Sequence, residues 1–276
     1  DWPVVIGIVG IGTFFVVSLL SLYASFQNIL IFYNGLVIQD SFTSLILLGS
    51  SIASIIYIIA VGKDGLKWSS RPALYSLIPL VLFGLFFLSG ATDALMILAS
   101  WLLVSVASYV FVSLPDGKES KEASIRYIMV GMIGTLILAF WVASFAISPR
   151  PDSSSFLLTS LIPTTKSGFS IVGLTVLLLI AALGFKVGLF PFHWWLPSVY
   201  GRGDGRGISF VAGIIKLGFI AIITRSIVIM ASSINGISPI ASYAALLIAF
   251  LSVASMVYGN IAALTSRDFQ VILSYS

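Results

Sequence analysis

Long apolar runs recur along most of this chain and constrain its fold more than any other feature. A helix needs about 20 mostly apolar residues to cross the hydrocarbon core of a bilayer. Apolar residues make up 59% of the sequence and charged residues only 9%. A soluble domain carries about a quarter charged residues, and its interior is too small to bury so much apolar surface. The sequence therefore predicts an all-α integral membrane protein.

Polar or glycine-containing connections divide the apolar runs into about eight transmembrane helices within a single domain, residues 1–276. We expect the sixth helix to break at Phe190-Pro191, because proline has no backbone N–H and its ring clashes with the preceding turn. A short amphipathic stretch follows the break. The predicted helices lie near residues 4–30, 41–61, 74–90, 93–113, 124–146, 169–200 (broken at 190–191), 208–230 and 239–263.

The basic residues of the connections predict the orientation of the helices. With eight spans the connections alternate between the two sides of the membrane, and only Arg150 and Lys166 fall on the side without the termini. The side with both termini carries Lys63, Lys67, Arg71, Lys118, Lys121, Arg126, Arg202, Arg206 and Arg267. Because basic loop residues concentrate on the cytoplasmic side, both termini are predicted to face the bacterial cytoplasm or the equivalent mitochondrial matrix.

Two lysines, Lys186 and Lys216, interrupt apolar runs where a charge is costly. A lysine at the membrane centre costs about 2.5–3.5 kcal/mol on insertion scales, so it persists where it faces a polar cavity or a partner. Alternatively, a lysine near a helix end extends its ammonium to the headgroups. Since two such lysines occur on consecutive helices, we favour a functional polar pathway, and a buried lysine suits a proton carrier.

The segment between the lysines contains Pro191 and the only histidine, His193. A helix broken at membrane depth frees carbonyls that are tolerated only beside protein or water. Such a break is typical of ion sites in transporters. His193 is a candidate proton relay because imidazole titrates near neutrality. The alternative is that the prolines only end a span and that Trp194 and Trp195 form an interfacial aromatic belt.

Asp93 opens the fourth predicted helix, where the helix dipole favours an acid, and we prefer this interpretation to a role in proton uptake. Cysteine is absent, and with a single histidine this excludes disulfides, Cys-ligated clusters, bis-His haem and His/Cys zinc sites. We therefore expect neither a bound cofactor nor a metal. The net charge of +4 is attributed to loop residues that set orientation rather than to nucleic-acid binding.

One motif around and after Lys186 resembles a known family. The motif comprises Gly184-Phe185-Lys186, Leu189-Phe190-Pro191-Phe192-His193, Trp195-Leu196-Pro197 and Val199-Tyr200. It is similar to antiporter-like subunit 2 of respiratory complex I (NADH dehydrogenase subunit 2), a family related to the multisubunit cation/proton antiporters. Segments 122–127, 258–264 and 273–276 resemble the same family, so the resemblance covers essentially the whole chain.

The resemblance implies a fold of inverted five-helix repeats, of which this chain supplies the second to ninth helices. It implies that Lys186 is a central proton carrier in a broken helix and that Lys216 connects it to the next half-channel. It also implies a membrane-arm subunit of a proton-pumping NADH:ubiquinone oxidoreductase, with NADH, FMN, iron–sulfur clusters and quinone on other subunits. The expected partners are membrane-arm subunits and lipids.

Two departures from the family bear on function. The family usually pairs its central lysine with a glutamate, and gap-free counting puts Leu102 at that position, so the carboxylate expected beside Lys186 is missing. The sequence also stops at Ser276, before the family's tenth helix. A separate polypeptide is expected to supply the remaining helices and to dock against residues 239–276. The alternatives are a truncated sequence and a loss filled by lipid or an unrelated subunit.

Other functions and locations stay open at this point. The first alternative function is a subunit of a multisubunit cation/proton antiporter with no redox partner. The second is a purely structural membrane-arm subunit that lost transport with the change to Leu102. We favour the mitochondrial inner membrane, because a shortened and divergent form of this subunit is more expected there. A bacterial plasma membrane and a thylakoid are the alternative locations.

Overall fold

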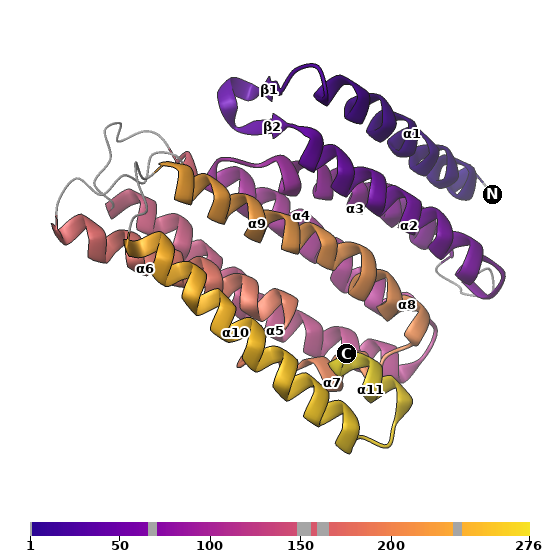
Figure 1. Cartoon of the computed structure of the whole chain (residues 1–276). Helices are drawn as coiled ribbons and strands as arrows, with labels where there is room; N and C mark the ends of the chain where they lie inside the picture. The colour runs from indigo at the N-terminus through magenta and orange to yellow at the C-terminus, as the bar shows by residue number, and fades with distance from the viewer. Residues whose placement is uncertain (1, 66–70, 148–155, 159–165, 234–238) are drawn as a thin grey trace.

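The computed structural model describes residues 2–65, 71–147, 156–158, 166–233 and 239–276, and helices account for most of them. The long helices run back and forth beside one another (Figure 1). They are α1 (Trp2–Ser25), α2 (Ser41–Gly65), α3 (Arg71–Gly90), α4 (Ala94–Ser113), α5 (Lys118–Ile147), α6 (Lys166–Val187), α9 (Lys216–Ser233) and α10 (Pro239–Thr265). Shorter helical segments are α7 (Leu196–Tyr200), α8 (Gly205–Phe210), η3 (Val211–Ile215) and α11 (Phe269–Tyr275).

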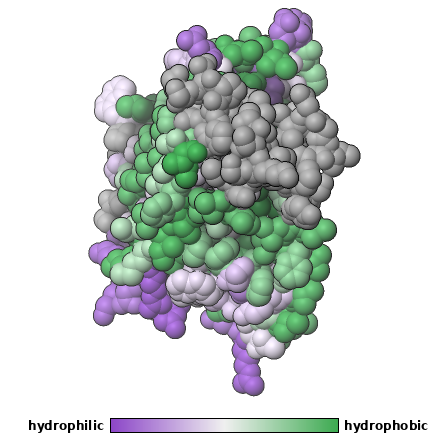
Figure 2. All heavy atoms as spheres, turned by 90° about the vertical axis from the view of Figure 1, so that its left-hand side faces the viewer, coloured by the Kyte–Doolittle hydropathy of each residue, from purple (hydrophilic) through white to green (hydrophobic). Residues whose placement is uncertain are grey.

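Seven helices in the described part of the chain are long and apolar enough to cross a membrane. They correspond to the predicted spans except the sixth, for which α6 provides a shorter apolar stretch, Gly173–Val187. Apolar side chains dominate the face shown in Figure 2, and hydrophilic side chains gather at its upper and lower margins. These features confirm the predicted all-α membrane fold.

A small β-hairpin follows α1 and was not predicted. The first helix ends at Ser25, and the chain then forms β1 (Leu30–Phe32), the turn η1 (Tyr33–Gly35) and β2 (Val37–Gln39), with the strands paired antiparallel. The loop of residues 33–36 joins Phe32 to its partner Val37, and within it Tyr33, Asn34 and Gly35 adopt positive φ angles of 53°, 56° and 91°, which asparagine and glycine tolerate best. The first predicted helix ends at residue 30 and the second begins at residue 41, so the hairpin occupies a stretch for which only a connection was predicted.

The core of the bundle surrounds α3 and α4. Of the residues in the most apolar stretch of α3, 56% are buried inside the protein. Helix α3 packs against α1, α2, α4 and α9. The hairpin is joined to the turn between α3 and α4, since Thr92 N donates to Leu36 O at 3.0 Å. At the opposite end of the bundle, Tyr57 Oη donates to the carbonyl of Arg206, which joins the end of α2 to α8. These contacts fix where the membrane-embedded parts of α2, α3, α8 and α9 lie.

Helix α10 lies at the edge of the bundle (Figure 1), and none of its apolar window Ala244–Thr265 is buried. Leu246, Phe250 and Val253 are each at least 60% exposed, although some small residues of the same helix are half-buried. After α10 the chain turns back as α11, which packs against α7. A face this apolar must contact either lipid or further helices. The structure thus presents α10 as an uncovered side of the bundle.

Candidate functional site

Lys186 lies in the last turn of α6 and is only 4% exposed. The helix ends one residue later because Gly188 adopts a φ of +84°, a conformation that glycine permits and other residues rarely take. The N–H groups of Gly188 and Leu189 both donate to the carbonyl of Gly184 at 2.9 Å, which closes the helix end. The break therefore begins three residues before the predicted site at Pro191, and it begins directly after the lysine.

Four aromatic rings surround the ammonium of Lys186. The distances from its Nζ to the ring centroids are 5.9 Å for Trp101, 4.8 Å for Tyr109, 5.1 Å for Tyr127 and 5.2 Å for Phe219. Nζ makes no hydrogen bond to any residue that the structure describes. The predicted orientation of the ammonium, into the protein rather than toward lipid, agrees with this placement.

Lys216 opens α9 directly after η3, a π-helical turn. π-turns inside α-helices are rare and occur frequently at functional sites. The Nζ of Lys216 lies 5.1 Å from the ring centroid of Tyr200. Both intramembrane lysines thus lie at helix irregularities, one before a break and the other after a π-turn. The sequence analysis did not predict this turn, because no residue type marks it.

A column of aromatic rings connects the two lysines. Tyr127, beside Lys186, stacks on Trp195 with centroids 5.5 Å apart, and Trp195 contacts Tyr200 edge to face at 5.6 Å. Tyr200 in turn lies beside Lys216. Trp195 is held by its Nε1–H, which donates to the carbonyl of Phe185 at 3.0 Å. The belt interpretation fits Trp194, which is 60% exposed, but Trp195 belongs to the buried core.

Leu102 lies on the outer side of α4 and is 43% exposed. It lines a hollow of about 370 Å³ with Tyr109 and Thr135. Its neighbour Trp101 points inward, where it meets Lys186 and donates from Nε1 to Thr135 Oγ1 at 3.0 Å. Inward-facing residues of α4 therefore supply rings to Lys186, while Leu102 is directed outward.

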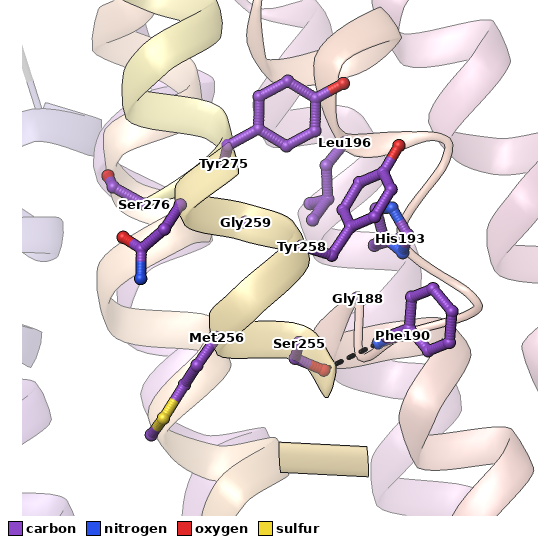
Figure 3. A pocket seen from close by; sticks show the side chains of 11 residues that line it. Gly188, Phe190, His193, Leu196, Ser255, Met256, Tyr258, Gly259, Tyr275 and Ser276 are labelled. Carbon is purple, nitrogen blue, oxygen red and sulfur yellow. Dashed lines mark hydrogen bonds between the residues drawn. The ribbon is translucent and has the colours of Figure 1, made fainter. Parts of the chain in front are cut away.

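His193 lies beside Tyr258 of α10 (Figure 3). The His193 ring is 4.2 Å from that of Tyr258, centroid to centroid, and its Nδ1 has no hydrogen-bond partner in the described part of the chain. The N–H of Phe190 donates to Ser255 Oγ at 2.9 Å. These residues line a hollow of about 290 Å³ together with Tyr275.

Asp93 is the N-cap of α4, as the preferred interpretation of the sequence had it. Its Oδ1 accepts hydrogen bonds from the N–H groups of Leu95 and Met96 at 2.9 and 3.2 Å. The side chain is 6% exposed. Capping of this kind satisfies backbone donors that have no partner within the helix. The geometry accounts for the buried carboxylate without a role in proton uptake.

A buried ion pair escaped the sequence analysis. Arg225 Nη2 lies 2.7 Å from Asp40 Oδ1 and 2.7 Å from Thr43 Oγ1, and Nε donates to the carbonyl of Ser89 at 2.5 Å. Burial raises the pKa of Asp40, but the Thr43 N–H and the Arg225 guanidinium together hold it below its ordinary value. Arg225 interrupts an apolar run as Lys186 and Lys216 do, so the argument that identified the two lysines could also have identified this arginine from the sequence.

A charged hollow of about 420 Å³ lies where α5, α7 and α11 meet. Its charged lining residues are Glu119, Glu122, Arg126, Arg202 and Asp268. This is the end of the bundle that carries the basic connections, and both termini lie toward it (Figure 1). No group of three or more potential metal ligands occurs among the described residues.

Residues 91–276 match the model of a protein family described as "NADH:quinone oxidoreductase/Mrp antiporter, TM". Among curated proteins, "NADH-quinone oxidoreductase subunit N 2" from Opitutus terrae is 26% identical over 263 residues, which cover 94% of this chain and 53% of that protein. The chain spans about half the length of the curated relatives it matches, with shares of 53%, 48% and 48% for three of them.

Two solved structures show the same fold. A chain of respiratory complex I from Thermus thermophilus superposes with a TM-score of 0.75 at 22% identity, covering 98% of this chain and 56% of that one. A chain of the Mrp complex from Dietzia sp. gives a TM-score of 0.83 at 18% identity, covering 99% and 51%. At these identities the likeness establishes the arrangement of helices, which is that of antiporter-like membrane subunits.

Proposed function

Because this chain belongs to the NADH:quinone oxidoreductase/Mrp antiporter transmembrane family, we propose that it is an antiporter-like membrane-arm subunit of a proton-translocating NADH:quinone oxidoreductase. Its curated relatives bear the name of subunit N of that enzyme. NADH, flavin, iron–sulfur clusters and quinone would then bind to other subunits, and this chain would contribute to proton transfer alone. Other membrane-arm subunits would be its partners.

The observation that carries the proposal is the pair of lysines at helix irregularities, linked by buried aromatic rings. A buried amine without a permanent counter-charge changes its protonation readily. Lys186 accepts a proton as a neutral amine and releases it as an ammonium, and Lys216 does the same at the other end of the aromatic column. The charged hollow lined by Glu119 and Glu122 is suited to proton uptake from the side of the basic connections.

His193 is proposed as a proton relay on the side of α10. Its Nδ1 has no partner among the described residues and faces a hollow that also contains Tyr258 and Tyr275, both able to exchange protons through their hydroxyls. Pro191 keeps this segment out of a regular helix.

Substitution of Lys186 tests the proposal. We expect Lys186→Ala in the intact complex to lower proton translocation per NADH oxidised at least tenfold, while the amount of assembled complex stays near normal. Lys186→Arg should be nearly as damaging, because a guanidinium does not release its proton. Translocation is measured with a pH-sensitive dye in reconstituted vesicles. Unchanged translocation in Lys186→Ala would instead favour a purely structural subunit.

A second candidate function is that of a subunit in a multisubunit cation/proton antiporter. The likeness to a chain of the Mrp complex favours it, and the family description covers both assemblies. Purification from the native membrane separates the two. Co-purification with flavin- and cluster-bearing subunits supports the oxidoreductase, and their absence together with sodium-dependent proton exchange supports the antiporter.

We propose that the uncovered face of α10 packs against helices equivalent to the part of the relatives that this chain does not match. A separate polypeptide is the expected source of those helices. The mitochondrial inner membrane is the proposed location, with both termini in the matrix, although the named relatives are bacterial. Fractionation of the cell and accessibility of terminal tags check the compartment and the orientation.

A further inference from the structure

We propose that the rings of Trp101, Tyr109, Tyr127 and Phe219 form a cation-binding cage that holds the ammonium of Lys186 in place of a carboxylate. This inference rests on the proposed function, since it names the residues that hold its proton carrier. The sequence analysis assigns no role to these four rings.

The geometry of the cage is that of cation–π contacts. All four centroids lie within 6 Å of Nζ, the range over which a ring face attracts a cation. Lys186 is 4% exposed, so little solvent competes with the rings. Desolvation strengthens such contacts, and four rings around one ammonium place the negative face of several quadrupoles on the same charge.

Edge-to-face pairs fix the orientation of the rings. Trp101 and Phe219 meet at 76° with centroids 4.7 Å apart, and Tyr109 and Tyr127 meet at 85° with centroids 5.1 Å apart. The rings come from three helices, since Trp101 and Tyr109 belong to α4, Tyr127 to α5 and Phe219 to α9. The cage is therefore a tertiary feature, held together by pairs that are themselves favourable.

The rings, and not the hydroxyls, contact the ammonium. The Tyr127 hydroxyl accepts a hydrogen bond from Ser108 Oγ at 3.3 Å. Nζ has no hydrogen-bond partner among the described residues, so neither hydroxyl reaches it. A tyrosine that acts through its ring is replaceable by phenylalanine but not by leucine. This difference separates a cage from a hydroxyl relay.

The first experiment measures proton translocation by the reconstituted complex. We expect Tyr127→Leu and Phe219→Leu each to lower translocation about tenfold, and Tyr127→Phe to stay within about twofold of the unmodified protein. Phe140→Leu makes the same kind of change on the exposed side of α5 and should have no effect. If Tyr127→Phe is as damaging as Tyr127→Leu, the hydroxyl is the active group and the cage is overturned.

The second experiment does not depend on transport. Membrane-permeant acylating reagents attack only the neutral amine, so a cage that stabilises the ammonium slows the labelling of Lys186, measured by peptide mass spectrometry with Lys216 as internal reference. Trifluorophenylalanine at position 219 keeps the shape of the ring and withdraws its electrons, and should speed labelling several-fold. Unchanged labelling overturns the cage. Faster labelling combined with normal transport in Lys186→Ala upholds the cage and overturns the proposed function.

Discussion

At the scale of single residues, the buried cations of this bundle are of two kinds. The guanidinium of Arg225 is matched by the carboxylate of Asp40 and by further oxygen acceptors, whereas the ammonium of Lys186 is met only by rings in the described part of the chain. A guanidinium keeps its proton in proteins, while a buried amine gives it up readily. The ion pair is therefore a structural link between α2 and α9, and the lysine is the residue suited to proton transfer.

Asp40→Asn is expected to destabilise the bundle, because it leaves the Arg225 guanidinium buried without a carboxylate. Breaking a buried pair in this way costs about 3–5 kcal/mol. Asp204→Asn is the matched control, since it removes the acid from the partly exposed pair with Arg206 and should cost less than about 1 kcal/mol. Thermal unfolding of the purified protein in detergent gives both values. Equal losses in the two variants contradict the assignment.

The same pair predicts a pH dependence. The folded-state pKa of Asp40 is below its ordinary value of 3.8, so its contribution to stability is complete above about pH 4 and is lost as the pH falls through the folded-state pKa. The unmodified protein should lose stability faster than Asp40→Asn over this acidic range. Unfolding curves recorded at a series of pH values give the change of stability with pH for both proteins. If stability falls equally with pH in the unmodified protein and in Asp40→Asn, the ion pair does not cause the pH dependence.

Gly131→Ala is expected to disturb the cage although it replaces none of the four cage residues. A Cβ at this position meets the hydroxyl of Tyr109 and lies 2.6 Å from its Cζ, so the ring must move. We expect proton translocation to fall several-fold while the protein still assembles. Gly49→Ala is the control, because a Cβ there has no heavy atom within 4 Å. Normal translocation in Gly131→Ala would show that the position of the Tyr109 ring does not matter.

At the scale of elements, hydropathy predicted the transmembrane helices and missed what happens at their ends and inside them. The hairpin at Asn34-Gly35 lies in the predicted connection between the first two helices, and the pairing of its two short strands was not predicted there. The π-turn before Lys216 has no such signal, because it depends on how α8 and α9 are held by their neighbours. The break after Lys186 was predicted from Pro191, whereas the backbone of Gly188 ends the helix.

Gly188→Ala tests the origin of that break. The φ of +84° is unfavourable for alanine, and a Cβ would lie 2.6 Å from Leu196 Cδ1. The expected cost is about 1–3 kcal/mol of stability, accompanied by a displaced Lys186 and reduced translocation. Gly173→Ala, in the same helix with no heavy atom within 4 Å of its Cβ, should be tolerated. The amount of assembled complex in native membranes is compared for the two variants. If Gly188→Ala assembles as well as Gly173→Ala, Pro191 rather than Gly188 is the cause of the helix break.

At the scale of the whole molecule, the sequence predicted the class of fold and the two lysines, and it could not predict the cage. Charge in an apolar run is visible in one dimension, so Lys186 and Lys216 stood out. The convergence of rings from α4, α5 and α9 on one ammonium exists only in three dimensions. Leu102, which the gap-free count put beside Lys186, is 43% exposed and lines a hollow that it shares with Tyr109, one of the rings around the ammonium.

The uncovered side of α10 gives a prediction at this scale. Because the chain has no cysteine, Val253→Cys introduces a single thiol on that exposed face. If further helices cover the face, a membrane-permeant maleimide should label this thiol slowly in native membranes and at least tenfold faster after detergent separates the subunits. Labelling at one rate in both states would mean that α10 faces lipid.

The π-turn has a consequence for the length of the segment around it. The segment is fastened at one end where Tyr57 holds the carbonyl of Arg206, and at the other where Arg225 meets Asp40. In a regular helix each residue advances the chain by 1.5 Å and rotates it by about 100°. A π-turn holds one residue more than an α-turn, so it takes up one residue while the helix on either side keeps its faces. Deleting one residue from 211–215 should therefore convert the π-turn into a regular α-turn and leave both anchors in place, whereas deleting one residue from the regular helix that follows should turn Arg225 by about 100° away from Asp40.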